Sequence, residues 1–349
     1  MRWGGVAGQG ILRRVRTVRR YVGRRAAGTT PRGGGLVCGM FSDPETRATA
    51  LAYLQVILAG TLWATSGPFS VALYRMGVPP TSVALLRPLV GTVFLALFLV
   101  ALRGRGAFLL PRRALLSLFV AGGVVVGIFQ LAYQMSTDAV GVPATVALLY
   151  LAPAFVVGMS AVLFREPLTP TRVGLAVLSV VGVWLTVFGA RGVDVDLTLA
   201  GILWGCACGL SYGTYTLFGK HYGKEHGPLV PLFWSTLGGT ILLAVTWIVR
   251  REPVVLPPSA AGWALLLLFG LLTMAVAALL LFNAMRTLEA GRASIGTTVE
   301  PFAAALLAVL LLDQTLTAQG WVGLVILVVG VAGAYAAGPT RRPPTSPVG

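Results

Sequence analysis

Runs of about 20 mainly apolar residues recur along most of the chain, with short polar connections between them. A helix that crosses the ~30 Å hydrocarbon core of a bilayer needs a run of this length. Helices are favoured over barrel strands because the runs are too long and too uniformly apolar to be strands. The pattern therefore predicts ten membrane-spanning helices, at residues 50–74, 81–102, 114–135, 142–164, 173–190, 198–219, 229–249, 260–285, 293–312 and 319–337.

The amino-acid composition agrees with an integral membrane protein. Of the 349 residues, 56% are hydrophobic and only 11% are charged, whereas soluble domains carry roughly 25% charged residues. The lipid bilayer is therefore the first predicted partner, and the fold class is an all-α polytopic membrane protein.

The net charge of +16 raises the alternative of nucleic-acid binding, but its distribution argues against that partner. Ten of the 27 Lys and Arg residues fall in residues 1–47, and most others lie in connections between apolar runs. Two interpretations of this basic extension stay open: it lies on an anionic membrane surface, or translation starts at Met40. Residues 338–349 are expected to form a disordered cytoplasmic tail.

The positive charges also predict an orientation, because cytoplasmic loops are enriched in Lys and Arg. With the N-terminus inside, 22 of them fall on the inner side and four on the outer side. Without residues 1–47 the ratio is still 12 to four. Both termini are therefore predicted to be cytoplasmic, as in a multi-pass protein of a bacterial-type plasma membrane.

The two halves of the chain resemble each other at a constant offset of 148 residues. The matches are Pro80 with Pro228, Gly91–Thr92 with Gly239–Thr240, Pro153 with Pro301, Leu168–Thr169 with Leu316–Thr317, and Gly182 with Gly330. They define two units, residues 50–190 and 198–337, of five predicted spans each. Because five is odd, the second unit enters the membrane inverted. Inverted repeats around a site at the bilayer midplane are typical of secondary transporters.

Two stretches at this offset carry a family resemblance. They are "LLYLAPAFVVGMSAVLFREPLTPTRVGLAVLSVVGVWL" (148–185) and "TTVEPFAAALLAVLLLDQTLTAQGWVGLVILVVGVAG" (297–333). Both resemble the EamA-like members of the drug/metabolite transporter superfamily, with a mid-helix proline, an acidic turn and a glycine-containing last helix. The first copy has Glu166 in that turn, and the second departs from the pattern with Asp313 and Gln314. The resemblance covers residues 50–337 and implies a transporter of small metabolites, such as amino acids or related compounds, or of drugs.

Arg87 and Glu300 are the two ionisable residues inside predicted spans. A charge at membrane depth costs about 2.5–3.5 kcal/mol, so such residues usually face a cavity or a partner. The two are predicted at about 10 Å from opposite faces, too far apart for a direct ion pair. Arg87 is expected to have a structural role, to reach towards the outer surface, or to bind a carboxylate in an outward-open cavity.

Glu300 is either a carboxylic acid kept neutral by burial or a site for a proton or an amine. Pro301 removes one helix hydrogen bond and frees the carbonyl of residue 297. Pro153 makes the same break in the first unit, where Ala152 stands in place of Glu300. We therefore predict that the prolines shape a central cavity and that Glu300 makes it able to bind a cation.

Other residues are candidates for packing or for lining this cavity. Gly201, Gly205, Gly209 and Gly213 recur every four residues and predict a ridge for close helix contact, with hinge bending as the second interpretation. The polar and aromatic candidates within spans are Trp63, Ser66, Gln130, Tyr133, Tyr150, Tyr212, Tyr215 and Asn283. Each alone is better explained by packing or interhelical hydrogen bonding, but together they suit a mainly apolar pocket with few polar groups.

The sequence thus predicts a secondary transporter that exports small, partly apolar molecules by alternating access with proton coupling. Small-molecule substrates and protons are the expected partners, a homodimer is left open, and no cofactor or metal site is expected. Two alternatives of other classes are an intramembrane lipid-modifying enzyme and a scaffold without transport. The enzyme would need clustered polar groups near one membrane face, and the sequence shows only isolated ones.

Overall fold

The structure is a computed structural model that describes residues 44–164, 169–192, 197–288 and 290–336. The predictions for residues 1–43 of the basic extension, for Glu166 and for the tail 338–349 lie outside this part of the chain. The elements of the first half are α2 (Pro44–Ala64), α3 (Ser66–Arg75), α4 (Pro80–Arg103), the 3₁₀ turn η1 (Arg105–Phe108), α5 (Arg112–Leu116), the π-helical η2 (Ser117–Gly122), α6 (Gly123–Leu149), α7 (Ala152–Phe164), α8 (Pro170–Gly189) and β1 (Ala190–Gly192).

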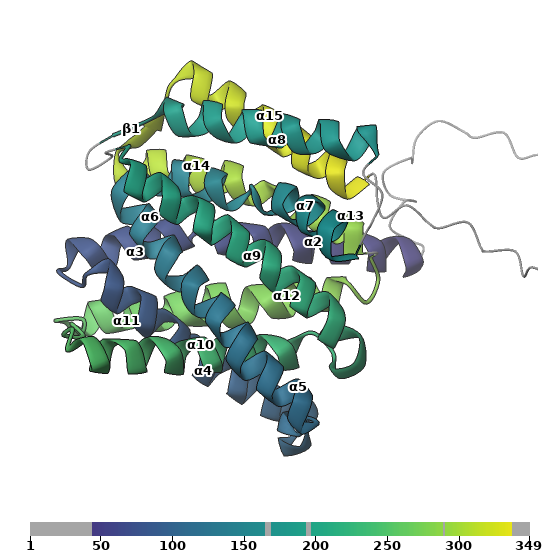
Figure 1. The fold of residues 1–349 in the computed structure, drawn as a ribbon, viewed down its shortest axis with the longest axis vertical. Coiled ribbons are helices and arrows are strands. Elements are labelled where there is room, and N and C mark those ends of the chain that lie inside the picture. The colour runs from purple at the N-terminus through teal and green to yellow at the C-terminus, as the bar shows by residue number, and fades with distance from the viewer. Residues whose placement is uncertain (1–43, 165–168, 193–196, 289, 337–349) are drawn as a thin grey trace, which may run out of the picture. The chain divides into compact units, whose positions relative to one another are not determined.

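The second half has a similar order of elements (Figure 1). They are α9 (Leu199–His226), α10 (Leu229–Arg250), α11 (Ala260–Gly270), the π-helical η3 (Leu271–Val276), α12 (Ala277–Ala284), α13 (Ala290–Gly296), α14 (Val299–Leu312), β2 (Gln314–Leu316) and α15 (Ala318–Ala336).

Within the described residues, eight helical stretches are long and apolar enough to cross a membrane. They are Glu45–Arg75, Pro80–Arg103, Arg112–Leu149, Pro170–Gly189, Leu229–Arg250, Ala260–Ala284, Arg292–Leu312 and Ala318–Ala336. The predicted spans at 142–164 and 198–219 are not among them: α7 has 13 residues, and α9 is long but less apolar. The protein is therefore a polytopic helical membrane protein.

The helix boundaries differ from the predicted ones around Asp138. The sequence predicts a connection at 136–141, but α6 continues through this segment and bends only at Gly141. Gly141 has φ 79°, which is strained for residues with a side chain and which glycine adopts readily. Asp138 is therefore an exposed residue of a helix. Like Arg87 and Glu300, it is an ionisable residue within an apolar helical stretch.

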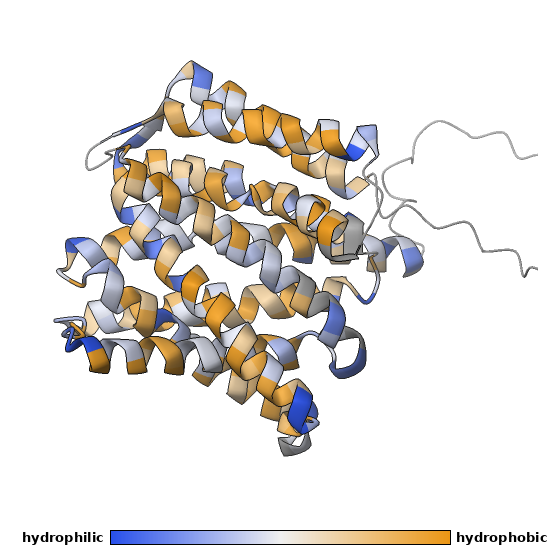
Figure 2. Ribbon diagram, in the orientation of Figure 1, coloured by the Kyte–Doolittle hydropathy of each residue, from blue (hydrophilic) through white to orange (hydrophobic). Residues whose placement is uncertain are grey.

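Figure 2 shows that the most hydrophilic residues gather at helix ends and connections, while helix middles are mainly hydrophobic. The exposed side chains of α4, α8 and α15 are correspondingly large and apolar, including Leu97, Val177 and Val329. In water such surfaces would be costly, so these helices are suited to face hydrocarbon.

Helices α8 and α15 lie side by side over most of their length (Figure 1). A Cβ atom on Gly182 would overlap the backbone of Leu327, and one on Gly323 would overlap the backbone of Leu185 and Thr186. Glycines at these positions let the two helices approach backbone to backbone.

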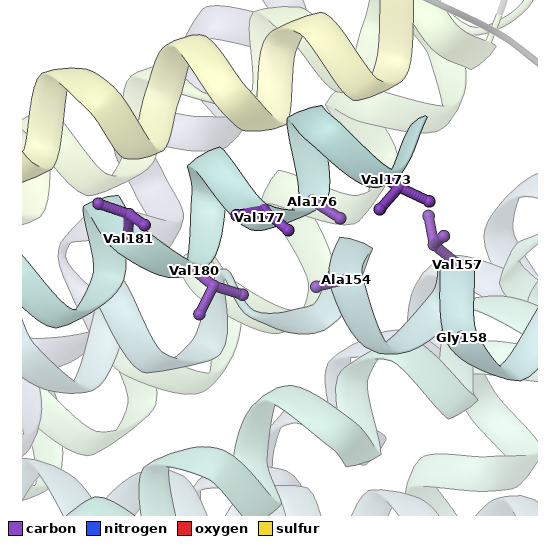
Figure 3. Close-up of a pocket in the computed structure, with 8 residues that line it drawn as sticks. All are labelled: Ala154, Val157, Gly158, Val173, Ala176, Val177, Val180 and Val181. Carbon is purple, nitrogen blue, oxygen red and sulfur yellow. The ribbon is translucent and has the colours of Figure 1, made fainter. Parts of the chain in front are cut away.

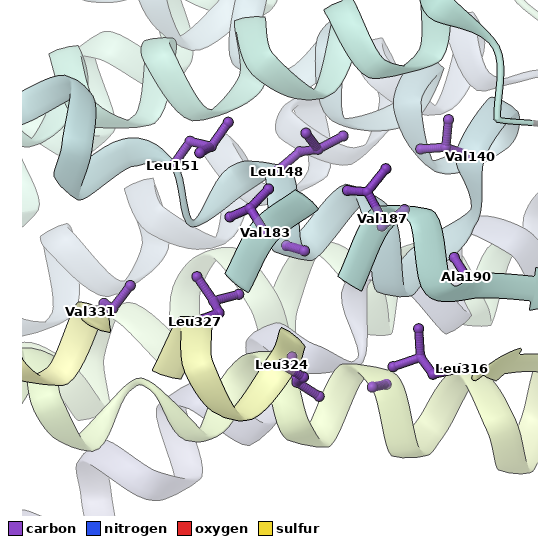
Figure 4. Packing of buried hydrophobic residues seen from close by; sticks show 13 residues of the cluster. Val140, Leu148, Leu151, Val183, Val187, Ala190, Leu316, Leu324, Leu327 and Val331 are labelled. Atoms are coloured by element: carbon purple, nitrogen blue, oxygen red, sulfur yellow. The ribbon is translucent and has the colours of Figure 1, made fainter. Parts of the chain in front are cut away.

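Strand β1 follows α8, and strand β2 precedes α15. The two strands form a short antiparallel ladder in which Ala190 pairs with Leu316 and Gly192 with Gln314. A buried cluster that includes Leu148, Val183 and Leu327 joins α6, α8 and α15 (Figure 4). The ladder and this cluster together tie a helix from each half of the chain into one packed body.

Candidate functional site

Glu300 lies just after a break between two helices. Helix α13 ends at Gly296, Thr297 and Thr298 form a turn, and α14 begins at Val299. Pro301 has no N–H, so the carbonyl of Thr297 has no donor at the usual position in the helix. That carbonyl accepts instead from the amide of Glu300 at 3.0 Å and from the hydroxyl of Tyr150 at 3.1 Å.

Tyr150 comes from the equivalent break in the first half of the chain. Helix α6 ends at Leu149, Tyr150 and Leu151 form a turn, and α7 starts at Ala152, directly before Pro153. The Tyr150 hydroxyl lies 3.0 Å from Oε2 of Glu300 as well as 3.1 Å from the Thr297 carbonyl, so its single hydrogen is shared between two acceptors. The two helix breaks therefore meet, and Glu300 bonds across them.

A small cavity lies at this meeting point. Its volume is about 20 Å³, which is room for roughly one water molecule. Its lining residues come from both halves of the chain: Leu149, Tyr150, Ala152, Pro153, Tyr212, Thr297, Glu300 and Tyr335. Glu300 supplies a carboxylate, three tyrosine side chains take part in the lining, and the rest of it is mainly apolar. The cavity is closed to anything larger than water in this conformation.

The glycine ridge of α9 packs along the first of these breaks. A Cβ atom on Gly201 would lie 2.7 Å from Ala139 and Val140, and one on Gly205 would meet Leu148. A Cβ atom on Gly209 would lie 2.7 Å from the carbonyl of Leu148 and 3.2 Å from that of Leu149. The second of these carbonyls is the one that Pro153 deprives of its helix donor.

Gly213 continues this contact into α7, where a Cβ atom on it would lie 3.1 Å from the carbonyl of Ala152. The ridge thus gives α9 room to pass directly over the break. It also brings Tyr212 of the same helix to the cavity wall.

Arg87 lies at a second polar cluster. It is only 5% exposed, so it does not reach towards a surface as one of the interpretations above supposed. Its guanidinium donates to Gln130 at 3.2 Å, to Ser66 at 3.4 Å and to Thr273 at 3.2 Å. These are three of the neutral polar side chains buried in the core of the helical unit.

The indole of Trp63 joins the same cluster, because its Nε1 donates to the carbonyl of Thr273 at 2.8 Å. Thr273 belongs to the π-helical η3, in which backbone carbonyls are displaced from the regular α-helical pattern. Thr273 therefore accepts from Trp63 and Arg87 of the first half, which links the two halves of the chain.

Three remaining candidates occupy different environments. Tyr133 is buried, with its ring centroid 5.7 Å from the Arg87 guanidinium carbon. Tyr215 is partly buried on α9, three residues beyond Tyr212, and does not line the cavity. Asn283 is exposed and donates to Gln55 at 3.2 Å, so it lies apart from both polar clusters.

Two residues that sequence reasoning did not single out take part in this region. Tyr335 lines the cavity from the end of α15, where its sequence neighbours are small residues typical of helix packing. In the sequence Gln314 is only a departure from the family turn, yet its side chain accepts from the backbone amide of Val142 at 2.9 Å. This bond satisfies an amide at the Gly141 bend, a role that only the fold reveals.

A larger groove lies elsewhere, between α7 and α8 (Figure 3). Its volume is about 320 Å³, and its lining is aliphatic or glycine: Ala154, Val157, Gly158, Val173, Ala176, Val177, Val180 and Val181. None of these side chains has a polar atom, so the groove offers no recognition of a polar substrate. Over the part of the chain that the structure covers, no group of three or more His, Cys, Asp or Glu residues gathers as a metal site.

Comparison with protein families matches residues 50–188 and 199–336, each to the EamA-like transporter family. The chain belongs to this family. Since EamA-like proteins form part of the drug/metabolite transporter superfamily, the resemblance drawn from the proline-containing stretches is confirmed. The protein is a membrane transporter.

Several relatives of this EamA-like transporter carry names of the same kind. An "Uncharacterized transporter" of Archaeoglobus fulgidus is 29% identical over 283 residues, which cover 81% of this chain and 94% of the relative. The "Uncharacterized inner membrane transporter YicL" of Salmonella typhimurium is 27% identical, over 81% of this chain and 95% of the relative. A solved structure titled "Crystal structure of protein" shares the fold, with a TM-score of 0.60 and 20% identity over 82% of this chain and 97% of that one.

Proposed function

We propose that this EamA-like protein is a secondary transporter that exports small, partly apolar metabolites or drugs by alternating access. The observation that carries this proposal is the bond between Tyr150 and Glu300, which joins the two helix breaks across a closed cavity. Broken helices that bring polar groups together inside a bundle are the usual way transporters build a site at membrane depth.

The proposed topology has ten spans in two inverted units of five. The family matches two consecutive segments of nearly equal length, which supports two repeated units. Residues 142–164 would form the fourth span, interrupted at Tyr150 and Leu151, and α9 would form the sixth. Both termini would be cytoplasmic, in accord with the Lys and Arg distribution. A plasma-membrane location is supported by the Salmonella relative, which is named as an inner membrane protein.

Glu300 is proposed to bind the coupling proton or an amine of the substrate. It is partly buried, and its carboxylate accepts from a neutral hydroxyl rather than from a cation. Since a lone carboxylate is costly in an apolar setting, exchange of a proton or binding of a cation would change the stability of the closed cavity. Opening to one face and then to the other would complete the transport cycle.

The test is flux driven by a pH gradient in proteoliposomes, with substrates first identified by growth of an overexpressing host on toxic metabolites and analogues. Wild type is compared with Glu300→Gln, which keeps the size of the side chain and removes its proton exchange. We expect the gradient dependence to be lost in the variant while the protein remains folded. Unchanged gradient dependence would remove Glu300 from coupling, and absence of any flux across the panel would favour a non-transporting protein.

A further inference from the structure

In the part of the chain that the structure describes, no carboxylate forms an ion pair with the buried Arg87 guanidinium, although buried cations are usually paired. The three side chains to which it donates are the neutral Ser66, Gln130 and Thr273, at 3.2–3.4 Å. Charge-assisted bonds from Arg to a carboxylate are shorter, about 2.7–2.9 Å, and are often bidentate. Its Nε has no hydrogen-bond partner among the described residues. The positive charge is therefore held by weak contacts with groups of no net charge.

Two aromatic rings lie close to this guanidinium. Its carbon lies 4.6 Å from the centroid of Phe269 and 5.7 Å from that of Tyr133. Ring faces attract cations, and they also leave the guanidinium edge available to an anion. Among the described contacts, the guanidinium therefore keeps a donor that no protein group accepts, which suits an anion site.

The Arg87 cluster is linked to the Glu300 cavity through packed aromatic side chains. Tyr133 contacts Arg87, and it belongs to the same buried cluster as Tyr150 and Tyr212. Those two tyrosines line the cavity around Glu300. A shift of the Tyr133 side chain would therefore extend the cavity to the guanidinium.

We propose that Arg87 is the subsite for an anionic group of the transported molecule, and that this group is a carboxylate. The proposal rests on the transport function above. It concerns recognition of an anion by Arg87, whereas Glu300 is proposed to bind a proton or an amine. When the cavity opens, the ligand carboxylate replaces the contacts with Gln130, Ser66 and Thr273 and accepts two N–H bonds from the guanidinium. The neutral contacts then hold Arg87 in place while the subsite is empty.

The test uses paired probes and does not require that the natural substrate be known. The melting temperature of the purified protein is measured with benzoate, isovalerate and phenylacetate, each compared with its uncharged amide. The variant is Gln130→Glu, which places a carboxylate of the protein where the Arg87 Nη1 already donates. The control is Gln314→Glu, the same substitution at a residue whose side chain contacts Val142 instead.

We expect at least one carboxylate, and not its amide, to raise the melting temperature of wild type and of the Gln314→Glu control. Gln130→Glu should fold and lose this response, with binding weakened at least tenfold. Equal effects of acids and amides on wild type, or an unchanged response in Gln130→Glu, would overturn the proposal. This result is separable from the flux test, because loss of proton coupling at Glu300 leaves carboxylate binding at Arg87 intact.

Discussion

Tyr150 and Glu300, which are 150 residues apart in the chain, meet with a hydroxyl-to-carboxylate distance of 3.0 Å. Each stands at a helix break, and each break has a proline shortly after it, Pro153 and Pro301. The bond therefore joins the two family segments at a helix break in each. Whatever opens the cavity must break this bond or carry both residues together.

Replacement of Tyr150 by Phe should impair transport while leaving the fold intact. The variant keeps the ring that packs beside Leu149 and removes the hydroxyl shared by Glu300 and the Thr297 carbonyl. Hydrogen bonds to charged groups contribute about 1.5–3 kcal/mol, so transport should fall about tenfold or more. The measurement is substrate flux in proteoliposomes at matched protein density.

Tyr335→Phe is the control for this change, because it removes another hydroxyl from the same cavity. The described contacts give that hydroxyl no bond to Glu300, so its loss should reduce flux by much less than tenfold. Equal losses in the two variants would mean that the Tyr150 bond has no special role.

The sequence predicted the architecture well because long apolar runs have few structural solutions in a membrane. The family, the helical class and most span positions follow from run length and from the matched prolines. The errors lie where helices bend. Residues 136–141 look like a connection, because polar residues and Gly141 interrupt the apolar run, yet the helix continues to the bend at that glycine.

The site was predictable in its components but not in its pairings. Glu300 and Tyr150 were both candidates, since each is a polar group within an apolar run. Their contact depends on how two helix breaks pack, and run length carries no information about that. Gln314 shows the same limit: it reads as an altered family turn, and only the fold brings its side chain to the amide of Val142.

Gly209 should be intolerant of any side chain. In Gly209→Ala, the new Cβ would lie 2.7 Å from one backbone carbonyl and 3.2 Å from the next, neither of which can move without shifting the helix break. Overpacking of this kind costs about 1–3 kcal/mol, so the unfolding midpoint in detergent should fall. Gly174→Ala in α8 is the control, because nothing lies within 4 Å of its Cβ position. If both variants melt alike, the close approach of α9 to the break does not limit stability.

Loss of the Gln314 side chain should destabilise the bend in α6. Gln314→Leu leaves the buried amide of Val142 without its acceptor, at a cost of about 1–3 kcal/mol. Gln314→Glu retains an oxygen in the same place and should keep more of the stability. The unfolding midpoints of the three proteins should therefore rank wild type, then Glu, then Leu. A Leu variant as stable as wild type would show that water or another group satisfies the amide.

The paired helices α8 and α15 should remain together throughout transport. Their backbones touch at Gly182 and Gly323. If one helix slid along the other, larger side chains would move into the narrow spaces that now hold only glycine, and they would clash with the facing backbone. The ladder beside them pairs Arg191 with Thr315, both exposed. Opposed residues in an antiparallel pair lie about 4.5–5.5 Å apart at Cα, within the range that a disulfide spans.

A disulfide between Arg191→Cys and Thr315→Cys should therefore form on mild oxidation and leave flux within about twofold of the reduced protein, since no relative motion of this pair is required. Reduction of the same sample gives the matched control. If oxidation stops transport and reduction restores it, the ladder must open during the cycle. In that case α8 and α15 would move relative to each other during transport, instead of the helices that carry Tyr150 and Glu300.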